Sequence, residues 1–449
     1  MLSNAMMAVL MSRSAPAALV CATLFAPTSA WGAEPNEEAE LVSGIDEPAE
    51  HADDPGRDLA NVILFAPRHI ADFLFWGTSV AVAVLENQQV VPRVQGFVST
   101  PGGRLAVLPT FFVETGGVFS VGARLIADLG NVATGLRLGF GGLHSFEIEP
   151  RVTFRLDVPL STINVEGLFK QDNDLEYLGV GQVPATDPRN RFLPGQRGAE
   201  AEYFEERVRW ILGYAVRPAE VVELAVSASL DRREVEDKKD GDLVLSDVFV
   251  PGSLPGDLET RTIFIADSAV RVDTRATRGR PSAGFLSEAY VGGGHAIRGP
   301  DVDFVRYGGR IAGFFPIYRT TNILSPKVVL DAVEPLYGHE LPFTELSGQP
   351  DFRGLDTRRD RISLVGSLDY RWLIISSIGF RLFGDTALVA PDYANIDFEA
   401  LRWALGMALD LHTNTSEIGQ LGFSAAPDGV RLLFSLGVST GYGDRLHRD

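Results

Sequence analysis

The segment LRWALGMALDL at residues 401–411 decides the fold class, because its side chains alternate strictly between two kinds. Alternation with a period of two predicts a β-strand whose two faces meet different surroundings. One face is large and apolar, and the other is charged or small: Leu401, Trp403, Leu405, Met407, Leu409 and Leu411 against Arg402, Ala404, Gly406, Ala408 and Asp410. We therefore expect a lysine at Leu405 to destabilise the strand, and a lysine at Gly406 to cost much less.

The same alternation returns in RVTFRLDV (151–158), VELAVSASLD (222–231) and GVRLLFSLGVSTGY (429–442). Runs of about 9–11 residues match a tilted transmembrane strand, whereas strands of soluble sandwiches are usually about five or six residues long. A sheet within a bilayer must close on itself, because an open edge leaves backbone groups unpaired. The sequence thus predicts an all-β fold, a transmembrane antiparallel β-barrel. At about 22 residues per strand and connection, it would have about sixteen strands.

Composition shifts divide the chain into five parts. An apolar run after Arg13 is typical of a secretory signal. The next stretch is acidic and without Lys or Arg until Arg57, which predicts a disordered linker. Helical spacing of Ile63, Ala66 and Ile70 predicts a short amphipathic helix before the barrel. The expected parts are a signal peptide (1–33), a linker (34–57), a helix (58–88), the barrel (89–442) and a polar tail (443–449).

Several function classes are disfavoured by composition. The formal charge of −19 argues against nucleic-acid partners, which need clustered Lys and Arg. Cys21 is the only cysteine and lies in the signal, so the mature chain would have no disulfide, zinc–thiolate site or cysteine nucleophile. His339 has no second histidine at helical spacing. We expect no enzyme activity, no metal and no cofactor.

Motifs in the C-terminal third, taken in order, resemble the barrel of the BamA/TamA superfamily, also called the bacterial surface antigen family. The resemblance is clear over about residues 270–442. It rests on DTRATRGRPSAGF (273–285), DFVRY (303–307), LPFTELSGQPDFRGLDTRRDR (341–361), LDYRW (368–372) and FRLFGDTALVA (380–390).

This resemblance implies an outer-membrane protein that assists insertion or translocation of other outer-membrane proteins through a weak seam between its first and last strands. We expect that seam between strands near 90–97 and 434–442. Family assembly factors usually carry POTRA domains, and residues 34–88 are too short for one. The expectation is a form without POTRA domains, in which the helix at 58–87 or a separate periplasmic partner takes their place.

The family also implies a loop that folds into the barrel lumen and binds the wall through an Arg-Gly tip. The tip V-R-G-F/Y matches Phe352, Arg353, Gly354 and Leu355, with leucine as a departure. The family's strand motif F-x-D-x-G matches Phe383, Asp385 and Ala387, with alanine in place of the last glycine. The resemblance therefore implies an Arg353–Asp385 pair.

Strand alternation independently places several charges in the lumen. Within IGFRLFGDTAL, Arg381, Phe383, Asp385 and Ala387 share the inward face, and Asp369 and Arg371 share that of the preceding strand. A carboxylate in a crowded lumen needs a partner, and arginine can supply two parallel hydrogen bonds. The alternatives are pairing of Asp385 with Arg381, and of Arg353 with Asp369 or Asp360. Arg298, in GGGHAIRGPD, is expected in an exposed glycine-rich loop.

The alternative to an insertion factor is a porin-like channel or structural barrel. Either would lie in the bacterial outer membrane with its lipid bilayer as partner. The insertion factor would also bind unfolded outer-membrane proteins or a periplasmic partner. Phe434 and Tyr442 are expected to anchor the last strand at the membrane.

Overall fold

The computed structural model describes residues 104–114, 120–142, 145–156, 160–238, 243–256, 258–275, 283–317, 321–355, 358–375, 378–412 and 417–436. The expected signal peptide, linker, amphipathic helix, polar tail and Tyr442 lie outside these residues, as do residues 89–103 of the expected barrel.

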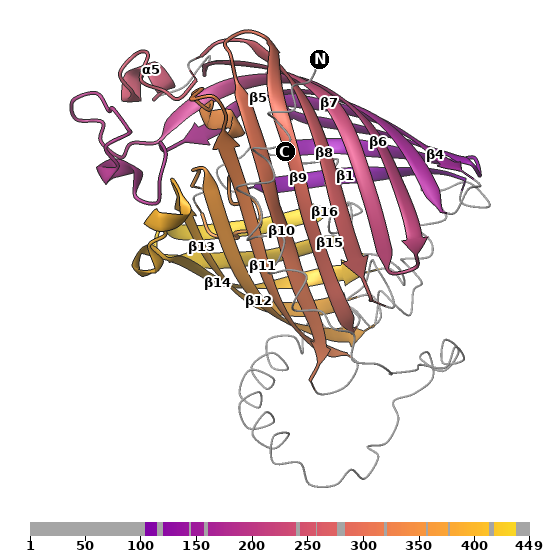
Figure 1. Cartoon of the computed structure of the whole chain (residues 1–449). Helices are drawn as coiled ribbons and strands as arrows, with labels where there is room; N and C mark the ends of the chain where they lie inside the picture. The colour runs from indigo at the N-terminus through magenta and orange to yellow at the C-terminus, as the bar shows by residue number, and fades with distance from the viewer. Residues whose placement is uncertain are drawn as a thin grey trace, which may run out of the picture. The chain divides into compact units, whose positions relative to one another are not determined.

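The described residues form sixteen antiparallel strands, which close into one barrel because β1 pairs with β16 (Figure 1). This confirms the barrel and its approximate strand number. The strands are β1 (Leu105–Glu114), β2 (Ser120–Asp128), β3 (Val132–Gly142), β4 (Ser145–Leu156), β5 (Ser161–Tyr177), β6 (Ala201–Ala219), β7 (Val222–Asp237), β8 (Arg261–Asp273), β9 (Gly284–Arg298), β10 (Asp303–Pro316), β11 (Asn322–Pro335), β12 (Ile362–Ile375), β13 (Ile378–Ala390), β14 (Arg402–His412), β15 (Glu417–Ala426) and β16 (Gly429–Leu436).

The described helical segments are short and lie in the connections: η2 (Pro184–Thr186), α5 (Leu245–Val248), η3 (Phe343–Glu345), η4 (Tyr393–Asn395) and η5 (Phe398–Ala400). Within the part of the chain that the structure describes, no helix is long and apolar enough to cross a membrane.

The two ends of the barrel differ in their connections. The long connections 178–200, 238–260, 336–361 and 391–401 all follow odd-numbered strands and therefore share one end, called here the long-loop end. Most connections at the opposite end are short, such as 220–221 and 376–377. Bacterial outer-membrane barrels show the same asymmetry.

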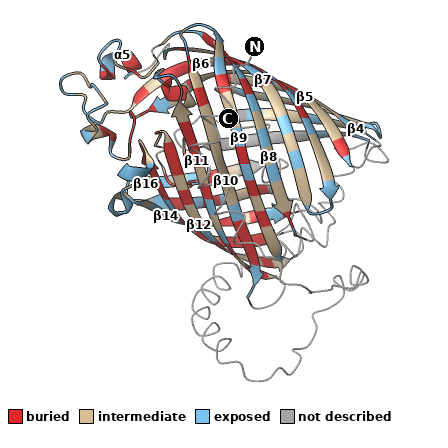
Figure 2. Cartoon of the chain, in the orientation of Figure 1, coloured by how far each residue is buried: buried red, intermediate tan, exposed pale blue. Residues whose placement is uncertain are grey.

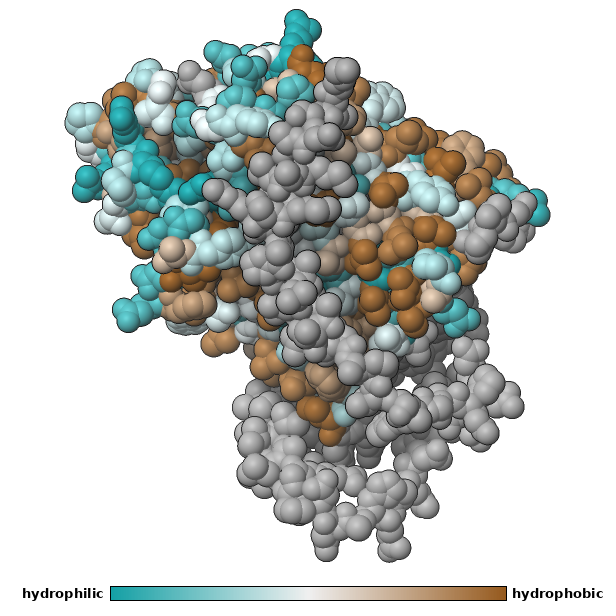
Figure 3. All heavy atoms as spheres, in the orientation of Figure 1, coloured by the Kyte–Doolittle hydropathy of each residue, from teal (hydrophilic) through white to brown (hydrophobic). Residues whose placement is uncertain are grey.

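Alternation along β14 is as expected. Trp403 and Leu405 face outward with 48% and 59% of their surface exposed, whereas Ala404, Ala408 and Asp410 face inward and are buried. Burial alternates in the same way along other strands (Figure 2), and apolar side chains gather on the visible outer surface (Figure 3). An apolar outer band around a polar, filled interior suits a barrel in a bilayer.

The strands β5, β6 and β7 are much longer than the 9–11 residues expected, with 17, 19 and 16 residues. At the long-loop end these strands pack against the two connections that they flank. Tyr177 and Tyr203 are buried there with Phe343 from the 336–361 connection and with Leu245 and Phe249. Packing against these connections lets the ladders continue beyond the length needed to span a bilayer.

Arg298 and the glycines before it do not form the expected exposed loop. Gly292, Gly293 and Gly294 lie within β9, and Arg298 is that strand's exposed last residue. A Cβ at Gly294 would overlap the ring of Phe304 on the paired strand. Glycine is therefore needed here for packing inside the sheet.

The expectation for Gly406 is also wrong. Gly406 faces inward, but a Cβ there would overlap the ring of Phe383 and the carbonyl oxygen of Phe423. Phe383 lies directly opposite on β13, so the glycine makes room for this ring. A lysine at Gly406 would displace the phenylalanine and would therefore destabilise the barrel.

The partner of the last strand also differs from the expectation. The sequence placed it near 90–97, which lies outside the described residues, whereas the strand that pairs with β16 is β1. The described pairing runs from Phe111 opposite Leu436 to Glu114 opposite Leu433.

Candidate functional site

Arg353 binds two carboxylates of the lumen wall at once. Its Nε and Nη2 atoms donate to the two oxygens of Asp385 at 2.8 and 2.6 Å, and Nη2 also donates to Asp369 at 2.6 Å. The backbone N–H of Arg353 adds a bond of 3.0 Å to Asp385. The pair implied by the sequence therefore forms, and one of its rivals forms with it.

The guanidinium is enclosed as well as paired. It lies over the Phe383 ring, with Cζ 3.8 Å from the ring centroid, so a cation–π contact covers the face that carboxylates cannot reach. Burial would lower the pKa of Arg353, but its bonds to Asp385 and Asp369 outweigh this effect and raise the pKa. Arg353 therefore stays charged inside the lumen.

The other predicted lumen charges have partners of their own. Arg381 binds Asp410 at 2.7 Å rather than Asp385, and Arg371 reaches Asp369 at 3.3 Å. Asp360 is not a partner of Arg353. It is fully buried beside the start of β12 and binds Arg189, as described below.

Phe352 anchors the apolar side of the loop tip, defined here as residues 352–355. Its ring is buried with Val329, Val365, Ala387 and Ala404, which come from four wall strands. The methyl group of Ala387, where the family motif has glycine, is completely buried as part of this pocket. The alanine therefore fills space next to Phe352 and does not obstruct the loop.

The loop tip also contacts the last hairpin. Ser424 on β15 donates to the carbonyl oxygen of Arg353, and Arg431 on β16 donates to that of Gly354 at 3.1 Å. Gly354 allows the close fit, because a Cβ there would overlap the Phe352 ring. Ser424 and Arg431 are not among the residues predicted for the site. Their inward position follows from strand alternation, but no motif marks them.

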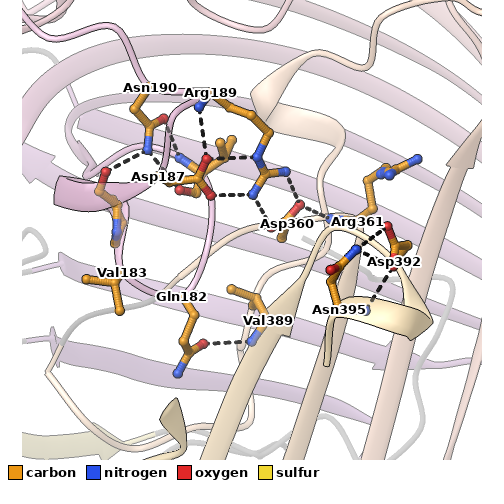
Figure 4. Close-up of polar contacts among 12 residues, drawn as sticks. Gln182, Val183, Asp187, Arg189, Asn190, Asp360, Arg361, Val389, Asp392 and Asn395 are labelled. Atoms are coloured by element: carbon orange, nitrogen blue, oxygen red, sulfur yellow. Dashed lines mark hydrogen bonds and ion pairs between the residues drawn. The ribbon is translucent and has the colours of Figure 1, made fainter. Parts of the chain in front are cut away.

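A second set of bonds joins two connections at the long-loop end (Figure 4). Arg189 donates to both oxygens of Asp360, at 2.9 and 2.6 Å, and also binds Asp187 at 2.6 Å. These bonds, first that to Asp360, raise the pKa of Arg189. Gln182 accepts from the N–H of Val389 at 2.8 Å and donates to the Ala400 carbonyl at 2.7 Å. Connection 178–200 is thus fixed to connection 336–361 and to the end of β13.

Comparison with solved structures finds a barrel with this architecture in BamA from Haemophilus ducreyi, in a form lacking POTRA domains 1–3. The likeness has a TM-score of 0.51 at 15% identity, and it covers 74% of this chain and 69% of that chain. The chain has the BamA fold. CdiB from Acinetobacter baumannii gives a TM-score of 0.46 at 10% identity, with coverage of 76% and 60%. The sequence matches no protein-family model and no curated protein.

The barrel closes where its first described strand, β1, pairs with its last, β16, and this junction is called here the seam. β1 and β16 pair at four described positions, whereas β15 and β16 pair at eight. Phe434, predicted as an anchor of the last strand, lies at the seam opposite Val113 and is partly exposed. Its predicted companion Tyr442 is outside the described residues.

In this BamA-type barrel, no group of His, Cys, Asp or Glu among the described residues is arranged to hold a metal ion. Arg353, Arg381 and Arg189 form ion pairs that join strands and connections. The arrangement is that of a barrel with an internal loop fastened to its wall.

Proposed function

We propose that this protein assists the insertion or translocation of outer-membrane proteins through the seam between β1 and β16. The observation that carries the proposal is the loop tip bound inside a closed sixteen-stranded barrel by Arg353, Asp385 and Asp369. The likeness of the fold to that of BamA supports it. The proposal assigns the chain no catalytic step and no cofactor.

The proposed location is the bacterial outer membrane. The outward strand faces are apolar, as at Leu405, and would contact lipid. The long-loop end would face the outside of the cell, because outer-membrane barrels keep their short turns in the periplasm. Unfolded outer-membrane proteins would arrive from the periplasmic side, either directly or through a separate periplasmic partner.

The physical basis is strand pairing at an opened seam. Separating β1 from β16 within a bilayer leaves N–H and C=O groups without partners, which is costly in hydrocarbon. An incoming strand restores these bonds by β-augmentation. The open seam would therefore bind a client strand and release it as the client closes its own barrel. No nucleotide is required, because folding of the client is itself favourable.

The rival reading, a porin-like channel, predicts ion flow through the lumen. The fastened loop and the contacts between connections 178–200 and 336–361 would restrict such flow. A direct test separates the two functions. The protein is placed in liposomes, and the folding rate of a small unfolded outer-membrane protein added outside is measured.

The seam is then locked by a disulfide between Val113→Cys and Phe434→Cys, which face each other across β1 and β16. The matched control locks Phe423→Cys to Leu432→Cys across β15 and β16, where the strands already share a hairpin. We expect several-fold acceleration that is lost only with the seam disulfide. No acceleration, together with measurable conductance, would support the channel instead.

A further inference from the structure

The last hairpin, β15–β16, contacts the loop tip at more points than the two hydrogen bonds that its side chains donate to carbonyl groups of the tip. Leu355 lies against Gly429, where an added Cβ would come within 2.8 Å of its Cδ2 atom. Arg402 holds Asp428 in the hairpin turn at 2.6 Å, and its guanidinium lies 5.1 Å from the centre of the Phe352 ring. The turn and both strands of the hairpin are therefore joined to residues 352–355, directly or through Arg402.

The two carbonyl groups of the tip need hydrogen-bond donors from the last hairpin. The oxygens of Arg353 and Gly354 are backbone acceptors inside the lumen, where a buried acceptor without a partner is unfavourable. Ser424 and Arg431 supply the donors. Because Arg431 is charged, its bond is stronger than one from a neutral donor. When the tip is seated, it gains bonds from β16 as well as from the wall at Asp385.

The tip therefore joins β12 and β13 to the last hairpin, on the β16 side of the seam. Its side chain is fixed to β12 and β13 through Asp369 and Asp385, and its carbonyl groups are fixed to β15 and β16. β16 is one of the two strands of the seam. Movement of β16 away from its described position must lengthen the bond between Arg431 and Gly354.

We infer that Ser424 and Arg431 are positioning residues that couple the loop tip to the seam. The seam stays in register while the tip is seated, and release of the tip frees β16. This inference rests on the proposed function, because it identifies the contact that regulates opening. The coupling is reciprocal, so a locked seam also holds the tip in place.

The test measures the seam without any client. Cys21→Ser removes the native cysteine, and Val113→Cys with Phe434→Cys reports seam closure through the rate of oxidative cross-linking in liposomes. We expect Arg431→Met combined with Ser424→Ala to slow cross-linking at least threefold. Arg431→Lys combined with Ser424→Ala, which keeps a charged donor at position 431, should restore most of the cross-linking rate. Arg306→Met, which removes an ion pair with Asp267 elsewhere in the barrel, is the matched control and should leave the rate unchanged.

Heat-dependent mobility in detergent gels verifies that each variant forms a barrel, so a misfolded variant is not counted. A second readout tests reciprocity: the seam disulfide should slow protease cleavage within residues 336–361 several-fold. The coupling would be overturned if the folded Ser424→Ala and Arg431→Met double variant cross-linked at the wild-type rate. It would also be overturned if locking the seam left protease cleavage unchanged. Neither measurement uses a client, so accelerated client folding without coupling would refute only this inference. Coupling without acceleration would refute only the proposed function.

Discussion

Arg353 satisfies two buried carboxylates with one guanidinium, so removal of the arginine has a larger effect than removal of either partner. Arg353→Ala leaves Asp385 and Asp369 facing the lumen without this donor, and we expect a loss of roughly 3–5 kcal/mol. Asp385→Ala should cost less, because Arg353 keeps its bond of 2.6 Å to Asp369. Urea unfolding of the barrel in detergent micelles would measure both losses.

Protease access gives an independent view of the same residues. Both variants should release the tip and speed cleavage within connection 336–361, with Arg353→Ala the faster. Arg298→Ala is the control, because Arg298 is exposed at the end of β9. The assignment of the tip would be wrong if Arg298→Ala exposed the connection and Arg353→Ala did not.

The residues of the site show which contacts a sequence can reveal. Arg353 and Asp385 were predictable, because a motif marks them and strand alternation points Asp385 inward. The shared use of Asp369 was expected only as an alternative, since spacing cannot show that one guanidinium reaches two strands. Arg189 was not predictable: its partner Asp360 is 171 positions away, and Asp360 was expected only as an alternative partner of Arg353. Ser424 and Arg431 bind backbone atoms, which have no sequence signal.

On the scale of single elements, β14 tests the orientation of the strands. Leu405→Lys places a charge on the lipid face, and we expect a loss of about 2–4 kcal/mol if the position lies near the middle of the bilayer. Leu401→Lys, in the connection directly before this strand at the long-loop end, is a matched control that should cost about 0–1 kcal/mol. Unfolding in lipid vesicles gives both values, and equal costs would contradict the depth or the register assigned to β14.

The connection 178–200 behaves as a separate element whose position depends on Arg189. Arg189→Met leaves the buried carboxylate of Asp360 without its guanidinium partner, so we expect a loss of about 1–3 kcal/mol. We also expect higher ion conductance in planar bilayers, because the connection is no longer fixed across the long-loop end. Arg191→Met, an exposed change nearby, should alter neither quantity. Unchanged conductance for Arg189→Met would show that this connection does not restrict the lumen.

Across the whole molecule, strand alternation was enough to predict a closed barrel of about sixteen strands. A wrong register would have turned every apolar face into the lumen, so the pattern strongly constrains the answer. Strand ends were less predictable. β5, β6 and β7 extend because the connections that pack on them support their ends, and no local pattern encodes that support. The sequence placed the partner of β16 too early for a similar reason, since pairing between the first and last strands is a property of the closed ring.

The barrel is a ring in which every neighbouring pair of strands is joined by a connection, with one exception at β1 and β16. Mechanically, the sheet is closed only by the non-covalent pairing of β1 with β16. Inside it, the loop tip of the 336–361 connection acts as a strap that ties the last hairpin to β12 and β13. If the chain were drawn out from its C-terminal end under force, the sheet would tear from that pairing. The strap should make β13 to β16 leave in one large extension, whereas without Arg353 the two hairpins should leave separately.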